Sequence, residues 1–552
     1  MFKNYLKIAL RVFNREKSFT TINVLGLAIG LAVTLLIIQY VRFEWSYENT
    51  HPDADKIVRL TMDYLDNGNV DAQDCETYPP IGPRIKAELS EVTDFVRVYN
   101  LGEPDINFKV GDRPLLLDKV YAADSSFFSI FNYPLIYGSQ KDIFKEPFQM
   151  VLSESTAMRL FNRLDIIGET GIVPQRDKEL TFKVVGVMPD SPPNTHLKIN
   201  MLISYPTMVA EFGENDANWN GNNTYTYVKL GENVDYSRFT SSLANFSDRL
   251  VAEEKIENER VIGQKISDIH LYSHKTFEPE NNNEALTVYF LLGVAFLVIL
   301  SAFVNYVNLA TSKALDRAKE VGVRKVIGSS KGQLQAQFLT ESALINVFAG
   351  ALAVVFITLS KNKFVELAGL PVDFPILNDP NFWLTLTEFT ILGILLSGAY
   401  PAFLLSSFKP SAVLKGSFGH SSKGIFLRKS LVVFQFAITI ILLVQTFTVF
   451  EQLNFMRETD LGLSVDQTVV VKAPAASEKK ESVGAFKQAL LQRADVQAVT
   501  LSGTVPGQPT SQFSTTTGIN LPDAATEHNY NFYLGGVDND FIEVMDLELL
   551  AG

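Results

Sequence analysis

The sequence of 552 residues has few of the residues that cross-link a fold or carry out nucleotide chemistry. It contains a single cysteine, Cys75, which excludes an intramolecular disulfide scaffold. No G-x-x-x-x-G-K-[ST] phosphate loop occurs, and the most similar stretch, "GSSKGQ" at 328–333, has the wrong order. The net charge of −13 disfavours a nucleic-acid partner, because phosphates require a basic face.

Charged residues are also missing from five long stretches of the chain. The charge-free runs contain 24, 28, 19, 20 and 21 residues, at 18–41, 285–312, 342–360, 389–408 and 430–450. Each reaches the roughly 20 residues that cross a hydrocarbon core about 30 Å thick. A single run could be a buried helix of a large soluble protein, but five runs predict a multi-pass α-helical membrane protein. Their lack of acids and bases disfavours the ion pathways of a secondary transporter.

The distribution of lysine and arginine predicts the orientation. Basic residues outnumber acidic ones in three segments, 1–17, 313–331 and 409–429. Short basic loops stay in the cytoplasm, so the N-terminus is expected inside and residues 42–284 and 361–388 outside. The first segment, "MFKNYLKIALRVFNREK", has an amphipathic pattern, which predicts a cytoplasmic helix at 1–19 lying in the membrane interface.

Residues 42–285 are expected to form a large extracytoplasmic α+β domain. Predicted strands are rich in Val, Ile, Thr and aromatic residues: "KIVRLTMDY", "TDFVRVYNL", "LTFKVVGVM", "TYTYVKL" and "KISDIHLYS". Predicted helices are "PPIGPRIKAEL", "SESTAMRLFNR" and "DYSRFTSSLANFSDRLVAEEK". In the second of these, Ser153 is the expected N-cap.

The chain also repeats itself. The stretch "VYAADSSFFSIFNYPLIYG" (120–138) returns as "GVDNDFIEVMDLELLAG" (536–552), at a constant offset of 414 residues. The same offset places Arg15, before the first apolar run, on Lys429, before the fifth. We therefore expect a second repeat to start near the fifth run and the chain to stop inside its outer domain.

No constellation of polar residues predicts an enzyme. His270 and His274 have a zinc spacing only on a helix, and "DIHLYSHK" is expected to be a strand leading into a turn. Ser153 and Ser155 lack a nucleophile context, and Cys75 has no cationic neighbour in the sequence. We predict no catalytic, cofactor-binding or metal-binding residue in the chain.

The most informative stretch is the basic insert between the second and third apolar runs. Leu315, Ala318, Gly322 and Val326 could form one apolar face of a short helix. Glu320 and Arg324 have the i,i+4 spacing of a surface pair, and Gly328 is the expected helix end. The plain interpretation is a solvated cytoplasmic loop. The alternative is a helix that docks a soluble partner.

These residues carry a family resemblance. "RAKEVGVRKVIGSSKGQL", "FLTESALI" and "SGAYPAFLLSSFKPSAVLKG" resemble the FtsX-like permease domain of MacB-type ABC transporters. "VYAADSSFFSIFNYPLIYG", "VLSESTAMRLF" and "FKVVGVMPDSPPNTH" resemble the MacB-like periplasmic core domain. The doubled arrangement is similar to the tandem eight-span permeases of Bacteroidetes, of which the chain holds the first half and part of the second.

The resemblance implies a permease subunit that couples a separate cytoplasmic ATPase to movements of a periplasmic domain. It implies no cofactor in this chain, since the partner ATPase dimer uses the ATP. The ATPase-coupling residues would be Arg317, Glu320, Gly322, Arg324, Lys325 and Gly328. Further implied partners are a periplasmic adaptor, an outer-membrane channel and membrane lipids, with no nucleic acid. The alternative function is an FtsX-like signalling regulator of envelope processes that has no transported substrate.

The expected location is the inner membrane, with the large domain in the periplasm. The expected segments, in chain order, are an interfacial helix (1–19), a span (20–41), the MacB-like core domain (42–285), a span (286–310), the coupling helix (311–338), a span (339–360), an outer loop (361–387), a span (388–408), a cytoplasmic linker (409–429), a span (430–450) and a partial second outer domain (451–552).

Overall fold

The computed structural model describes residues 2–101, 106–111, 113–174, 178–407, 422–459, 462–463, 467–471, 480–508, 513–519 and 530–550. The chain forms two compact units. The helical unit contains Met1–Trp45 and Ala285–Thr459, and the sheet unit contains Ser46–Glu284 and Asp460–Gly552. Most of the predicted linker at 409–429 lies outside the described residues.

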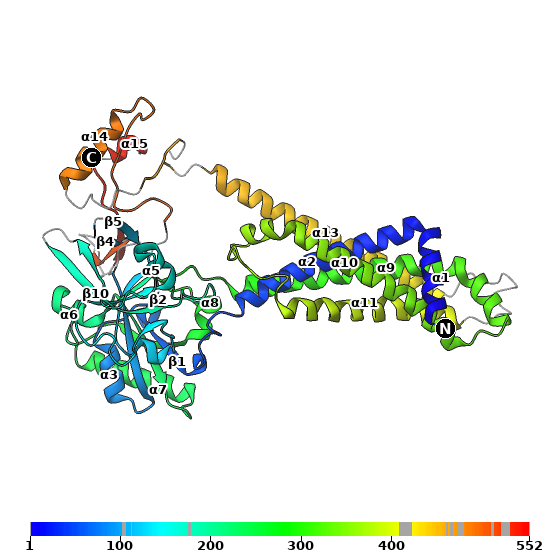
Figure 1. The fold of residues 1–552 in the computed structure, drawn as a ribbon, viewed down its shortest axis with the longest axis horizontal. Helices are drawn as coiled ribbons and strands as arrows, with labels where there is room; N and C mark the ends of the chain where they lie inside the picture. Colours follow the sequence, from blue (N-terminus) through cyan, green and yellow to red (C-terminus); the bar gives the residue numbers. More distant parts are fainter. Residues whose placement is uncertain are drawn as a thin grey trace. The chain divides into compact units, whose positions relative to one another are not determined.

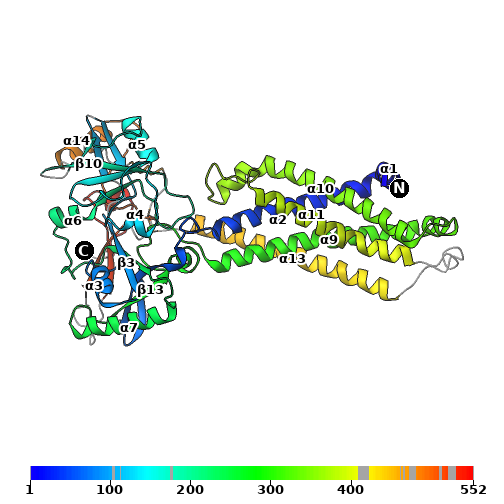
Figure 2. The ribbon, with the colours of Figure 1, turned by 60° about the horizontal axis from the view of Figure 1, so that its bottom comes forward.

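The helical unit is a bundle of long helices (Figures 1 and 2). Its helices are α1 (Phe2–Arg15), α2 (Lys17–Glu44), α9 (Ala285–Val326), α10 (Lys331–Leu367), α11 (Pro380–Ser407) and α13 (Ser422–Glu458). One apolar core, which includes Leu31, Phe303 and Ala353, joins α2, α9, α10 and α11. The backbones of α2 and α9 approach closely at Gly30, where a Cβ atom would lie 2.8 Å from the Cβ of Ala302. Small residues at such crossings are typical of membrane bundles.

The bundle has the length and composition of membrane-spanning helices. Among the described residues, four helices are long and apolar enough to cross a membrane, within Lys17–Glu44, Ala285–Ala310, Lys331–Leu367 and Lys429–Glu458. The predicted span at 388–408 falls in α11, whose described apolar stretch, Pro380–Leu396, is shorter. The prediction of a multi-pass helical membrane protein is therefore confirmed.

Helix α1 is separated from α2 at Glu16 and packs on the bundle. Ala9 is fully buried, and the ring of Phe13 lies 6.2 Å from the ring of Phe348 on α10. Leu10, the neighbour of Ala9 in the sequence, is 44 % exposed. Part of the apolar side of α1 therefore packs against α10, and part of it is exposed on the surface of the bundle.

The sheet unit is built on one large mixed sheet. Its strands follow the order β13-β1-β12-β3-β6-β11-β8-β10-β9-β4-β5, with β2 on β1 and β7 on β10. The pairs β6–β11 and β8–β10 are parallel, and the other pairs are antiparallel. The strands are β1 (Ile57–Asp66), β2 (Asn69–Asp74), β3 (Val92–Asn100), β4 (Ile106–Val110), β5 (Arg113–Leu117), β6 (Val120–Ala123), β7 (Tyr137–Gly138), β8 (Gln149–Ser153), β9 (Thr170–Pro174), β10 (Glu179–Met188), β11 (Met201–Ser204), β12 (Thr224–Leu230) and β13 (Glu259–Lys265).

Short helices cover this sheet and bury its apolar faces. They are η1 (Ala54–Lys56), α3 (Ile81–Glu88), α4 (Phe127–Ile130), α5 (Glu154–Phe161), α6 (Tyr205–Phe212), α7 (Tyr236–Ala252), η2 (Ile266–Asp268) and α8 (Ile269–Tyr272). One core cluster joins α3 and α7 to β1 and β12, and another joins α5 and α6 to β8, β10 and β11. The α+β class predicted for this part of the chain is confirmed.

Most of the predicted elements of the sheet unit match the structure. The first four predicted strands correspond to β1, β3, β10 and β12, and Ser153 caps α5 by accepting a hydrogen bond from the Thr156 amide. The prediction of a strand at "KISDIHLYS" is wrong, because these residues form η2 and α8. The strand lies just upstream, as β13, and the polar pair Ser267–Asp268 breaks the alternation that a further strand would need.

The described part of the C-terminal region contains α14 (Lys480–Leu491), β14 (Ser514–Ile519), β15 (Tyr530–Leu534) and α15 (Phe541–Val544). Three backbone features recur at the offset of 414 residues found in the sequence. They are the ends of α2 and α13 at Glu44 and Glu458, the bounds of α4 and α15, and the left-handed residues Asn132 and Asp546, with φ of 52° and 53°. The repeated sequence therefore adopts a repeated local structure.

Candidate functional site at the turn between α9 and α10

The predicted docking element is the tip of a helical hairpin. A short, separate helix was expected within 311–338, but α9 continues without a break to Val326 and α10 begins at Lys331. Gly322 is accommodated inside α9, so the first residue that stops the helix is Gly328, with φ of +105°. The insert is therefore the continuation of two membrane helices and the turn that joins them.

Backbone hydrogen bonds fix the end of α9. The Gly328 amide donates to the carbonyl of Lys325 at 3.1 Å, and the Ser329 amide donates to the carbonyl of Arg324 at 3.0 Å. This pattern, with glycine in a left-handed conformation, is a Schellman motif. The predicted role of Gly328 as the helix end is confirmed.

The start of α10 is fixed just as closely. The Ser330 hydroxyl accepts from the Gln333 amide, and the Gln333 side chain accepts from the Ser330 amide at 3.0 Å. This capping box satisfies two backbone donors of the first turn. Val321 of α9 packs against Leu334 and Phe338 of α10 in a small buried cluster, so the two helices are also held by their side chains.

A polar chain crosses the hairpin behind the turn. The Arg324 guanidinium donates to Glu320 on its own helix at 2.5 Å and to the Gln337 amide oxygen on α10 at 2.5 Å. Gln337 donates in turn to Glu341 at 3.0 Å, and both of these α10 residues are buried. Arg324 and Glu320, predicted as an i,i+4 pair, do form one, and they are part of the hairpin's internal structure.

The outer side of the tip is apolar and basic. Val323, Val326 and Ile327 are 48 %, 65 % and 79 % exposed, respectively. Lys325 lies among them, and partial burial, followed by repulsion from Lys331, lowers its pKa. Val323 and Ile327 were missed by the sequence prediction, and Val326 was expected on the apolar face of a short helix. The apolar pair that directly precedes the glycine in "KVIG" is the sequence signal that would have identified them.

The structure brings most of the predicted coupling residues to this tip. Glu320, Arg324, Lys325 and Gly328 lie within the last turns of α9 and the connection to α10. Arg317 lies earlier on α9, about one turn before Glu320, and its side chain is outside the description. Leu315, Ala318, Gly322 and Val326 were predicted to share one apolar face. For the two of them whose burial is described this prediction is wrong, because Gly322 is buried and Val326 is exposed.

The remaining candidate groups of the chain do not converge. His270 is buried in α8 and His274 is exposed beyond its end. In the described residues, no group of three or more His, Cys, Asp or Glu side chains is arranged to hold a metal. Cys75 is fully buried, and that burial raises the pKa of its thiol.

Two family models match the chain, one covering α2 and most of the sheet unit and the other lying within the helical unit. The MacB-like periplasmic core domain matches residues 20–246, and the FtsX-like permease C-terminal domain matches residues 292–410. The chain belongs to the FtsX/MacB-type ABC permeases. The α9–α10 tip of this permease chain lies inside the FtsX-like match, and all strands of the large mixed sheet except β13 lie inside the MacB-like match.

Known relatives of this permease chain are distant in sequence. It is 23 % identical over 260 residues to the macrolide export ATP-binding/permease protein MacB of Aggregatibacter actinomycetemcomitans, a match that covers 45 % of this chain and 36 % of the relative. It is 23 % identical over 261 residues to the pyoverdine export ATP-binding/permease protein PvdT of Pseudomonas savastanoi pv. phaseolicola, which covers 46 % and 36 %. The chain spans about a third of the length of these relatives.

A solved structure, the periplasmic region of MacB from Actinobacillus actinomycetemcomitans, is 14 % identical, with a TM-score of 0.29. This match covers 40 % of the permease chain and 92 % of that structure.

Proposed function

We propose that this chain is the permease subunit of an ABC-type export complex, in which a separate cytoplasmic ATPase drives movements of the extracytoplasmic domain. The proposal rests mainly on the exposed tip of the α9–α10 hairpin. Three exposed apolar side chains next to lysines are costly in a solvated loop, and they are typical of a surface that a protein partner covers.

The construction of the hairpin supports transmission of force. The tip is fixed by the Schellman motif, the capping box and the Arg324–Gln337 contact, so a displaced tip would carry both helices with it. Helix α9 is unbroken over its 42 residues, which is about 63 Å at 1.5 Å per residue. Its other end, Ala285, is the point where the chain returns from the sheet unit.

The rest of the complex follows from the same proposal. The basic segments support a cytoplasmic N-terminus in the inner membrane. An ATPase dimer would supply ATP hydrolysis, and a periplasmic adaptor and an outer-membrane channel would complete the export path. The relatives are named for export of macrolides and of pyoverdine. For this chain we propose export of a compound that is taken up on the outer side of the inner membrane.

The test is capture of an ATPase by the full chain in lipid nanodiscs, using the ABC ATPase subunits encoded nearest to its gene. The variants are Lys325→Glu and the double change Val326→Ser with Ile327→Ser, because Val326 and Ile327 are exposed and Lys325 is the partly buried basic residue next to them. Arg324 is left unchanged, since its guanidinium holds the hairpin together. Lys363→Glu is the matched control, since Lys363 is exposed near the opposite end of α10.

We expect each tip variant to weaken capture at least tenfold while its thermal stability stays within about 2 °C of the wild type, as is usual for surface changes. The Lys363 control should capture the ATPase normally. If the wild type retains no ATPase, or if the tip variants capture as well as the control, the tip is a solvated loop and the proposal is wrong.

A further inference from the structure

The chain passes between the two units three times, after Trp45, before Ala285 and after Thr459, and the segments at the first two passages flank the large sheet in the sequence. The entry segment, 46–51, follows α2, and the exit segment, 273–284, precedes α9. Any movement of α2 or α9 reaches the sheet through these residues. Each segment contains a buried carboxylate that pairs with a residue outside the segment, Glu48 with His196 and Glu278 with Arg59.

The entry segment is held by Glu48. This residue is 1 % exposed and has a left-handed φ of 62°, which is uncommon outside glycine and marks a constrained backbone. Its carboxylate accepts from the His196 amide at 2.6 Å and lies 2.9 Å from the Nδ1 atom of the same histidine. Burial alone would raise the pKa of Glu48, but the charge and hydrogen bonds of His196, with a further bond to His51, hold it well below its usual range.

His196 extends this contact to the sheet. Its Nε2 atom and the hydroxyl of Tyr227 on β12 are hydrogen-bonded at 2.7 Å. The neighbouring Asn194 donates to the backbone carbonyl of Ser46 at 2.8 Å and receives the Glu48 amide on its own carbonyl. The residues just after α2 are therefore tied to β12 through buried side chains.

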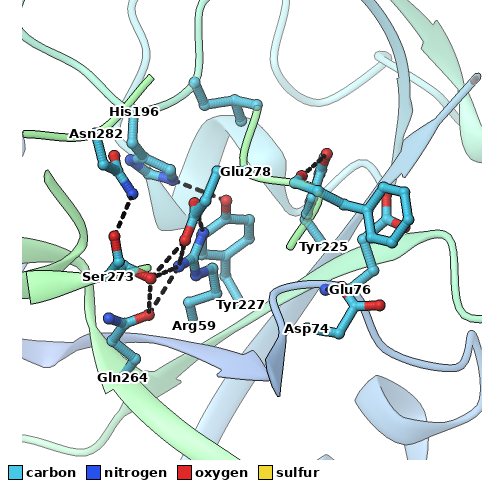
Figure 3. A network of polar contacts seen from close by, with 12 residues as sticks. Arg59, Asp74, Glu76, His196, Tyr225, Tyr227, Gln264, Ser273, Glu278 and Asn282 are labelled. Atoms are coloured by element: carbon cyan, nitrogen blue, oxygen red, sulfur yellow. Dashed lines mark hydrogen bonds and ion pairs between the residues drawn. The ribbon is translucent and has the colours of Figure 1, made fainter. Parts of the chain in front are cut away.

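The exit segment is held by Glu278 (Figure 3). Its two carboxylate oxygens accept from the Arg59 guanidinium at 2.6 and 2.7 Å, in a bidentate pair. Arg59 lies on β1 with a fully buried side chain, and it also donates to Gln264 at 2.7 Å and to Ser273 at 3.1 Å. Asn282 donates to the Ser273 carbonyl, which closes the exit segment on itself.

The two sets of contacts meet at the β1–β12 pair. Arg59 lies directly opposite Tyr227 in the strand register, and Figure 3 shows the two side chains next to each other. The entry and exit segments also both contact His270 of α8. The ring of Tyr47 in the entry segment stacks on the ring of His270, with centroids 3.3 Å apart and planes within 2°. His270 accepts the amide of Asn283 in the exit segment on its carbonyl.

We infer that Glu48, His196, Tyr227, Arg59 and Glu278 form one polar coupler that makes the entry and exit segments move together with strands β1 and β12. These are positioning residues, and their role rests on the proposed function, in which α2 and α9 transmit movement to the sheet. A buried ion pair is weak support for stability, because apolar residues of similar volume often stabilise a core as well. It does impose a single geometry on its partners, which a transmitted displacement requires.

The test is hydrogen–deuterium exchange of the full chain in nanodiscs, without any ATPase. Tyr227→Phe removes one hydroxyl from the centre of the coupler and lies in neither segment. Tyr133→Phe is the matched control, since it is also buried and its hydroxyl makes only a 3.5 Å contact with Ser191. Loss of one buried hydrogen bond should raise exchange in the entry segment about fivefold. Because Tyr227 lies opposite Arg59 on the neighbouring strand, the inference expects exchange in the exit segment to rise as well.

A second comparison uses Glu48→Gln, Glu278→Gln and the double variant. Each single change should speed exchange in both segments, and the double change should add less than the sum of the two. Effects confined to the mutated segment, with additive doubles, would mean two independent contacts and would overturn the inference. If the glutamine variants do not fold, the comparison of Tyr227→Phe with Tyr133→Phe decides alone.

A third comparison separates this inference from the proposed function. With a captured ATPase, a non-hydrolysable ATP analogue should change exchange in both segments of the wild type. In Tyr227→Phe the two segments should no longer respond together, while capture of the ATPase is retained. If no ATPase is captured at all, the proposed function fails and the exchange experiments on the chain alone still decide whether the coupler exists.

Discussion

Replacing Gly328 by alanine changes the backbone preference of the α9–α10 tip and almost nothing else. A Cβ atom at this position would have no heavy atom within 4 Å, so the substitution introduces no clash. The φ of +105° is nevertheless a conformation that L side chains rarely adopt. Gly332 lies in the first turn of α10, and a Cβ atom added there would also have no heavy atom within 4 Å. Its φ is not positive, which makes Gly332→Ala the matched control.

The two changes should act in opposite directions. A non-glycine residue in a left-handed conformation costs about 1–2 kcal/mol. Alanine in place of a helical glycine stabilises the helix by about 0.5–1 kcal/mol. A loss of 1–2 kcal/mol changes the population of the closed turn by a factor of about 5–30. Gly328→Ala should therefore open the Schellman motif, and Gly332→Ala should not.

The assay is hydrogen exchange of the amides of residues 328 and 329, which donate to Lys325 and Arg324 in the closed turn. Both amides should exchange about 5–30 times faster in Gly328→Ala and no faster than wild type in Gly332→Ala. ATPase capture should fall in the first variant alone. Equal exchange in the two variants would refute the argument that the left-handed glycine holds the tip in shape.

Two other predictions concern the sheet unit. Burial raises the pKa of Asp74 to about 7 and that of Glu259 to about 7, so the folded unit holds these protons more tightly than the unfolded chain. This stabilisation is complete below about pH 4 and is lost as the pH rises through 7, so thermal unfolding should occur at higher temperature at pH 5 than at pH 8, and Asp74→Asn should flatten the profile. At Gly171 a Cβ atom would lie 2.0 Å from the buried ring of Phe108, so Gly171→Ala should destabilise the unit by about 1–3 kcal/mol, whereas Gly221→Ala, with open space, should leave its melting temperature unchanged.

Local patterns in the sequence were sufficient for much of the fold. The apolar runs gave the membrane helices, and the β-branched runs gave β1, β3, β10 and β12, because burial and strand propensity act over a few neighbouring residues. Ser153 was recognisable as a cap because its partner, the Thr156 amide, is three residues away. Gly328 was recognisable because only glycine fits the conformation that ends α9.

Features that depend on distant residues were not predictable. The order of the strands in the sheet depends on pairings between segments more than a hundred residues apart, such as β1 with β12. Arg59 reads as an ordinary strand residue until Glu278, 219 residues later, is placed against it. The exposure of Ile327 was missed for a different reason. The sequence shows an apolar residue near a helix end, and such a residue is expected to be buried in the protein unless a partner covers it.

In the repeated stretches 120–138 and 536–550, the structure shows one ion-paired aspartate in each copy. Asp124 and Asp538 are 414 residues apart, and the amide of each donates to an upstream backbone carbonyl, that of Arg97 in the first copy and that of Leu501 in the second. In the first copy Asp124 pairs with that same Arg97, but in the second Asp538 pairs with Lys487 from α14. Both copies have the aspartate, but its basic partner lies on strand β3 in the first copy and on helix α14 in the second. At the offset of 414 residues Arg97 falls on Ser511, so the basic residue is not repeated, although the second aspartate is still paired with a cation.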